Sequence, residues 1–140
     1  MKNYSVFDII GPRMTGPSSS HTAGAARLAL VARHIAHSDV TDVHFVLYGS
    51  FAETGKGHGT DKALIAGALG MEPDDPNIKN AYQIARERGV LVSVEFSDAP
   101  TEHPNTARID ITGTSGAHTV VVGVSVGGGN ILITEINGLG

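Results

Sequence analysis

The sequence predicts an α+β fold, a single domain in which a mixed, largely antiparallel sheet packs against helices. Three observations support this class. Apolar residues recur at helical spacing in the first part of the chain, β-branched residues form strand-like runs in the last part, and glycine-rich turns separate those runs. A chain with helices early and hairpins late favours antiparallel pairing. Its 140 residues suffice for one domain with a substantial core.

Three helices are expected. Residues 22–37 carry Leu28, Val31 and Ile35 at helical spacing, and residues 62–69 form an apolar run. After a turn at residues 73–76, residues 77–88 form an amphipathic helix that Gly89 ends. The apolar face of this last helix consists of Ile78, Ala81, Tyr82 and Ala85. Residues 4–10 are compatible with a helical turn or with an extended arm.

Five strands are expected from β-rich or alternating runs. They cover residues 43–48, 90–96, 107–112, 118–125 and 130–136. Residues 113–116 supply the turn of a hairpin, and residues 49–61 form a glycine-rich polar loop. Gly127 to Gly129 either let the backbone pass close to a site or a partner, or form a plain bulge.

Composition excludes several function classes. A formal charge of -4 and a pI near 5.9 argue against binding to nucleic acid. The absence of cysteine rules out a disulfide scaffold, a thiolate nucleophile and a thiolate metal site in this chain. No apolar run approaches the roughly 20 residues that span a bilayer, and the first residues have no signal core. A cytoplasmic protein without a membrane segment is therefore expected.

Residues 16–22 read Gly-Pro-Ser-Ser-Ser-His-Thr and lead into the first helix. A helix start has unpaired N–H groups and the positive end of the helix dipole, so hydroxyls and an imidazole there can hold a carboxylate or a phosphate. The alternative is a plain N-cap, which accounts for one of the three serines. This segment is a candidate anion site.

Residues 55–61 read Gly-Lys-Gly-His-Gly-Thr-Asp and precede the second helix. The spacing departs from that of a nucleotide-binding phosphate loop, which excludes nucleotide hydrolysis. Thr60 or Asp61 can cap the helix, while His58 lies between two glycines and is free to approach a ligand closely. His34 and His37 favour a helix C-terminus by charge rather than a metal site, since no third ligand lies near them in sequence.

Four segments together, residues 16–22, 48–50, 55–61 and 125–129, closely resemble the β chain or β domain of iron-sulfur-dependent L-serine dehydratases. The resemblance covers essentially the whole chain, which is identified as a serine dehydratase β domain over residues 1–140. It implies a fold like the allosteric substrate-binding domain of phosphoglycerate dehydrogenases. It also implies a partner α chain whose cysteines hold a [4Fe-4S] cluster, with the active site between the two parts. Two-chain relatives usually continue into an ACT domain, which these residues do not include.

The resemblance implies a β component that converts L-serine to pyruvate and ammonia within an α/β complex and is inactive alone. The residues implied to bind substrate are Ser18, Ser19, Ser20 and Thr22, and those implied to act in catalysis are His21, His58, Thr60 and His103. His58 is the favoured base. Because the chain has no thiolate, the cluster is expected on the partner and no metal or cofactor on this chain. A homo- or hetero-oligomer is expected.

Two other interpretations stay open. The chain can be a stand-alone regulatory domain that binds a small anion or an amino acid at residues 16–22, or a plain dimerisation module. His103, which lies in a His-Pro-Asn-Thr run, can also be a solvated loop residue. His58 separates the dehydratase interpretation from that of a regulatory domain, because an effector site needs donors and charge but no imidazole between glycines.

Overall fold

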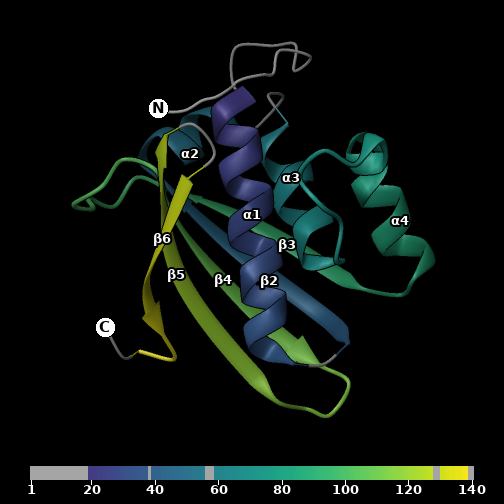
Figure 1. The fold of residues 1–140 in the computed structure, drawn as a ribbon. Helices are drawn as coiled ribbons and strands as arrows, with labels where there is room; N and C mark the ends of the chain where they lie inside the picture. The colour runs from purple at the N-terminus through teal and green to yellow at the C-terminus, as the bar shows by residue number, and fades with distance from the viewer. Residues whose placement is uncertain (1–18, 38, 56–58, 128–129, 139–140) are drawn as a thin grey trace.

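The computed structural model describes residues 19–37, 39–55, 59–127 and 130–138. The helices are α1 (Ser19–Ala36), α2 (Gly49–Gly55), α3 (Thr60–Ala68) and α4 (Ala81–Glu87), with a 3₁₀ helix η1 (Pro76–Asn80) before α4. The strands are β2 (Val40–Tyr48), β3 (Leu91–Ser97), β4 (Thr106–Gly113), β5 (His118–Gly127) and β6 (Asn130–Ile136). Figure 1 shows their arrangement.

The strands form one mixed sheet in the order β3-β2-β4-β5-β6. β2 pairs with β3 in parallel, and the other three pairings are antiparallel. The parallel pair arises because the connection from β2 to β3 runs through α2, α3 and α4, a crossover long enough to reverse the direction twice. The predicted α+β class with a largely antiparallel sheet is confirmed.

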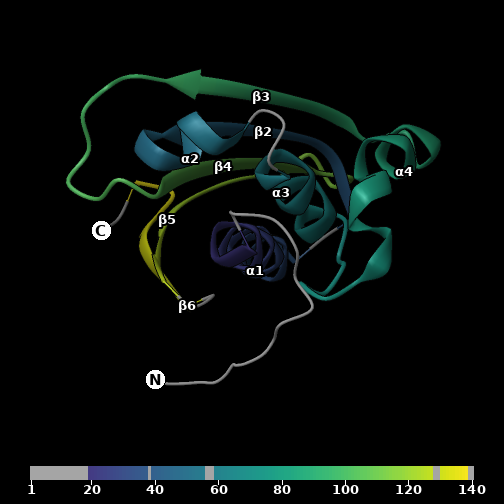
Figure 2. The same ribbon diagram turned by 90° about the horizontal axis from the view of Figure 1, so that it is seen from above.

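The helices α1, α3 and α4 lie on one face of the sheet, which curves around α1 (Figure 2). On that face Phe45, Ile109 and Val121 sit side by side across the three central strands, and all three are fully buried. The neighbouring positions on the opposite face mix polar residues with valines, and His44 lies there beside Asp110. The period of two along each strand thus separates core from solvent.

α1 and α3 pack so closely that their backbones are in contact. A Cβ atom placed on Gly67 would lie 2.3 Å from the carbonyl oxygen of Ala26 and 2.8 Å from the Cβ of Ala29. Both alanines are fully buried. Small residues on the two helices therefore set the distance between them, and only glycine fits at position 67.

Two predicted segments need correction. α1 begins at Ser19 rather than at residue 22, so the hydroxyl-rich run lies partly inside the first turn of the helix. Residues 49–55, predicted as part of a loop, form α2. The reason is tertiary: Phe51 is fully buried, and the N–H of Ser50 donates to the carbonyl oxygen of Pro104 at 2.6 Å. These contacts override the low helix propensity of glycine.

The predicted helix at residues 77–88 is split into η1 and α4. The side chain of Asp75 caps η1 by accepting from the N–H of Asn77 at 2.8 Å. Ala81 and Ala85 are buried as predicted. Tyr82 departs from the prediction, because its side chain is 40% exposed and leaves the core. The remaining helices and strands are confirmed, with their ends within three residues of the predicted positions.

Candidate functional site

The sequence motifs meet at one end of the domain, where α1 and α3 begin and where β2 and β5 end (Figure 1, upper end). A Cβ atom on Gly59, just before α3, would lie 3.9 Å from the Oγ1 atom of Thr22 in α1. A Cβ atom on Gly24 would lie 2.5 Å from the Oγ atom of Ser125 near the end of β5. Segments far apart in sequence are thus in contact at this end. We call this region the candidate site.

Two helix starts lie next to each other in the candidate site. α1 has no acidic residue in its first turn, so nothing there offsets the positive end of its dipole. α3 begins after Gly59, whose φ of 87° is left-handed and which provides no capping side chain. The start of α1 therefore suits a small anion such as a carboxylate, whereas the first turn of α3 already contains the carboxylate of Asp61.

Thr60, the first residue of α3, is the most informative side chain of the candidate site. It is 0% exposed, and its Oγ1 atom has no hydrogen-bond partner among the residues that the structure describes. A buried hydroxyl without a partner costs about 1 to 3 kcal/mol. Such a group is explained if it donates to, or accepts from, a bound molecule.

His103 lies in the loop between β3 and β4, and its ring is fixed in one tautomer. Its Nδ1 atom accepts a hydrogen bond from the N–H of Asn105 at 3.1 Å. In the neutral ring the hydrogen atom therefore sits on Nε2. Nε2 can donate to a ligand, but it cannot accept a proton in that form. The geometry favours His103 as a donor over His103 as a base.

The loop that carries His103 is held from several sides. The carbonyl oxygen of His103 accepts from the hydroxyls of Thr101 at 2.7 Å and Thr106 at 2.6 Å. The carbonyl oxygen of Asn105 accepts from the N–H of Ser125 at 3.0 Å. Since Ser125 also packs against Gly24, the loop is connected to the start of α1 through β5. A loop held this firmly can position a functional group.

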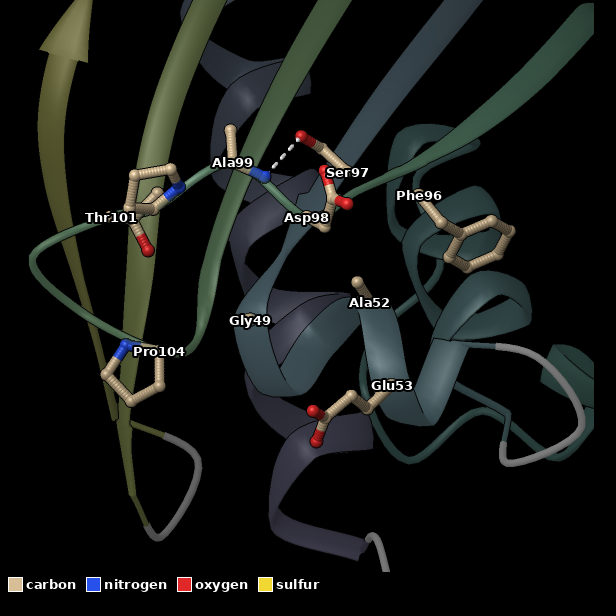
Figure 3. Close-up of a pocket in the computed structure, with 10 residues that line it drawn as sticks. Gly49, Ala52, Glu53, Phe96, Ser97, Asp98, Ala99, Thr101 and Pro104 are labelled. Carbon is tan, nitrogen blue, oxygen red and sulfur yellow. Dashed lines mark hydrogen bonds between the residues drawn. The ribbon is translucent and has the colours of Figure 1, made fainter.

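A hollow of about 690 Å³ adjoins the candidate site between α2 and the loop after β3 (Figure 3). Ala52 and Glu53 of α2 face the end of β3 across it. The residues that line it are Gly49, Ala52, Glu53, Phe96, Ser97, Asp98, Ala99, Pro100, Thr101 and Pro104. Its lining includes Gly49, which follows β2, and Pro104, which follows His103, but neither Thr22 nor Thr60. The hollow is therefore a neighbour of the motif residues rather than their common cavity.

The structure describes most of the predicted site residues, but not all of them. Ser18 and His58 lie outside the described residues, so their roles stay predictions. Ser19, Ser20, His21 and Thr22 all belong to the start of α1. Thr60 is adjacent to that start through Gly59. His103 reaches it indirectly, through Asn105 and Ser125.

Sequence reasoning missed a contact between Asp61 and Tyr82. The hydroxyl of Tyr82 in α4 donates to the Oδ2 atom of Asp61 at 2.6 Å. Burial and this hydrogen bond raise the pKa of Tyr82 well above its usual range. The two residues are 21 positions apart, and Tyr82 has the spacing of a core residue, so no local pattern indicates the pair.

Within the described ranges, no three or more His, Asp or Glu side chains gather as a metal site requires. That this chain binds no metal stays a prediction. None of the helices in the described part of the chain is long and apolar enough to cross a membrane.

Comparison with known proteins gives a consistent result. The sequence model of a family described as "Serine dehydratase beta chain" matches residues 5–91. The chain is 52% identical over 138 residues to the "Probable L-serine dehydratase, beta chain" of Bacillus subtilis (strain 168), and 45% identical over 142 residues to the "L-serine dehydratase, beta chain" of Peptoniphilus asaccharolyticus. Both alignments cover 99% of this chain, which spans 62% and 63% of those two relatives. "L-serine dehydratase 2" of Escherichia coli (strain K12) is 46% identical over 80 residues, 53% of this chain and 17% of that protein.

Proposed function

Because this chain belongs to the serine dehydratase β-chain family, we propose that it is the β component of an iron-sulfur-dependent L-serine dehydratase, which converts L-serine to pyruvate and ammonia. The names of the two β-chain relatives support the substrate and the reaction. The proposed partner is an α chain that holds a [4Fe-4S] cluster. The proposed setting is the cytoplasm, in a complex of α and β chains.

The observation that carries the proposal is the hydroxyl of Thr60, which is buried beside the start of α1 and has no partner among the described residues. In the proposed site, the N–H groups at the start of α1 and the hydroxyls of Ser18 to Ser20 and Thr22 hold the substrate carboxylate. Thr60 adds a hydrogen bond from the start of α3. His103 donates from Nε2, the ring nitrogen that its Asn105 contact leaves free to donate.

Dehydration of serine requires the loss of a weakly acidic Cα proton and of a hydroxide. We propose His58 as the base that takes the proton, with His21 as the next candidate. When bound by the α chain, the cluster would supply the Lewis acid for the departing hydroxyl. This chain has no cysteine and so cannot hold that cluster by thiolate ligation, which is why it is proposed to be inactive alone.

The test is co-expression with the candidate α chain under anaerobic conditions, followed by an assay of pyruvate from L-serine. The complex should be active, and the isolated chain should show neither turnover nor a bound cluster after reconstitution with iron and sulfide. Turnover by the isolated chain would overturn the proposed division of roles. An inactive complex, with serine binding to this chain alone, would favour a regulatory domain instead.

Two variants test the proposed roles within the complex, with cluster content measured in each. His58→Ala should lower kcat by about a hundredfold or more and leave KM nearly unchanged, because proton transfer is felt in the transition state. Ser19→Ala should mainly raise KM, because a carboxylate donor acts on substrate and transition state alike. A kcat of His58→Ala within about threefold of the parent would move the base elsewhere, given the usual contribution of a positioned base.

A further inference from the structure

The first turn of α3 is held by a side chain from outside the four motifs. Tyr82 of α4 donates its hydroxyl to Asp61 Oδ2 at 2.6 Å, and Asp61 Oδ1 accepts from the N–H of Lys62 at 2.8 Å. Each carboxylate oxygen of Asp61 thus has a fixed partner. One partner lies in the helix itself, and the other lies in α4.

This contact replaces an ordinary helix cap. Gly59 occupies the N-cap position of α3 and offers no side-chain hydrogen bond. Asp61, the second residue of the helix, supplies the acceptor instead, for the N–H of Lys62. A carboxylate there is also favoured by the helix dipole. An exposed carboxylate has several rotamers, and the hydroxyl of Tyr82 selects one of them.

The rest of α3 does not need Tyr82. Leu64, Ile65 and Ala68 are fully buried and pack α3 against the core over its later turns. Tyr82 is 40% exposed and lies at the edge of the core rather than within it. Its contact is confined to the first turn, which contains Thr60.

We propose that Tyr82 is a positioning residue for the candidate site, which orients the hydroxyl of Thr60 toward the ligand by fixing Asp61 and the first turn of α3. The role in turnover rests on the proposed function. Tyr82 itself does not touch the substrate. The effect passes through Asp61 and the peptide groups next to it.

The test compares Tyr82→Phe with Gln83→Ala in the α/β complex. Tyr82→Phe removes only the hydroxyl. Gln83→Ala is the matched control, because Gln83 lies on the same helix and its exposed amide donates to Glu87 of that helix, at 3.2 Å. Tyr82→Phe should lower kcat for L-serine by about tenfold, the effect of one hydrogen bond to a charged group. Gln83→Ala should leave kcat unchanged.

A second readout, amide hydrogen exchange in the isolated chain, does not depend on activity. The N–H of Ala63 donates to the carbonyl oxygen of Gly59 at 2.9 Å and reports on the first turn. The N–H of Leu69 donates to Ile65 at 3.0 Å and reports on the last turn. In Tyr82→Phe, Ala63 should exchange about tenfold faster while Leu69 is unchanged, as expected for local opening. Gln83→Ala should affect neither amide.

Several outcomes would overturn the role of Tyr82. Equal acceleration at Ala63 and Leu69 would mean general destabilisation, and unchanged exchange at Ala63 would mean that Tyr82 does not hold the turn. Faster exchange at Ala63 with unchanged kcat would mean that the turn does not orient Thr60. An inactive parent complex would instead overturn the proposed function, and the exchange experiment would then decide by itself whether Tyr82 fixes the first turn.

Discussion

The N–H of Ser50 donates to the carbonyl oxygen of Pro104 at 2.6 Å, which connects the start of α2 to the loop that carries His103. The approach is close because the preceding residue is Gly49, at a φ of 56°. A side chain there would meet Pro104 directly. The turn after β2 and the loop before β4 therefore depend on each other, and substitutions at either should affect both.

Gly49→Ala should destabilise the protein more than Gly89→Ala. Both glycines have left-handed backbones, which cost alanine about 1 to 2 kcal/mol. A Cβ on Gly49 would also lie 2.2 Å from the oxygen of Pro104, whereas a Cβ on Gly89 has nothing within 4 Å. We expect an extra loss of about 1 to 3 kcal/mol for Gly49→Ala, the usual cost of overpacking. Urea unfolding of both variants measures it, and equal losses would contradict the tight contact.

The tautomer of His103 can be tested by two substitutions, each of which preserves the hydrogen-bonding function of one ring nitrogen. Asparagine places an acceptor where Nδ1 lies, and glutamine places a donor where Nε2 lies. His103→Asn should keep the loop and the melting temperature but lose about tenfold in kcat/KM of the complex, as expected for one lost donor. His103→Gln should keep more activity than His103→Asn. If both variants lose about a hundredfold, His103 acts as an acid or a base.

Thr60→Val should separate stability from activity. The Oγ1 atom of Thr60 is buried and unpaired within the described chain, so an isosteric methyl group should leave the melting temperature unchanged or raise it. Thr106→Val is the control, because that buried hydroxyl donates to the oxygen of His103. Its loss should cost about 1 kcal/mol. Calorimetry gives the two melting temperatures, and a clear fall for Thr60→Val would indicate a structural partner for its hydroxyl.

In the complex, Thr60→Val should lower kcat/KM for L-serine by about tenfold or more, since a site that hydrogen-bonds its ligand is weakened when that bond is lost. Unchanged kinetics for Thr60→Val would remove Thr60 from the proposed site.

The contribution of Tyr82 to the free energy of unfolding should decrease at alkaline pH. Its pKa is raised in the folded state, mainly by burial and then by the bond to Asp61. A raised pKa means that the unfolded chain loses this proton first, so the contribution is complete below about pH 10 and declines as the pH rises above that value. The difference in unfolding free energy between the parent and Tyr82→Phe should be constant from about pH 7 to 9 and shrink above about pH 10. A difference that stays constant to about pH 11 would contradict the shift.

The sequence was sufficient for most elements because their signals are local. The helical spacing of Leu28, Val31 and Ile35, and the alternation that makes the hairpin of β4 and β5, depend only on near neighbours. α2 was not predictable in this way. Its helix depends on the burial of Phe51 and on the carbonyl oxygen of Pro104, which is more than 50 positions away in the chain.

The candidate site was also predictable only where its signals are local. Its residue types were predictable, because hydroxyls and glycines around helix starts indicate anion binding from short segments. Three other features depend on tertiary structure: the contact of Thr22 with the start of α3, the packing of Ser125 on Gly24 and the tautomer of His103. His58, the favoured base, lies outside the described residues and stays a prediction.

The close crossing of α1 and α3 at Gly67 has a mechanical consequence. A Cβ atom on Gly67 would lie only 2.3 Å from the carbonyl oxygen of Ala26, so the two backbones touch there. Neither helix can slide past the other without opening this contact. The later part of α3 is therefore fixed against α1 before any ligand arrives, whereas the position of its first turn, which contains Thr60, depends on the hydrogen bond between Tyr82 and Asp61. A molecule that bridges the two helix starts has no hinge to close at this crossing, so any closure over it must come from another segment or from a partner chain.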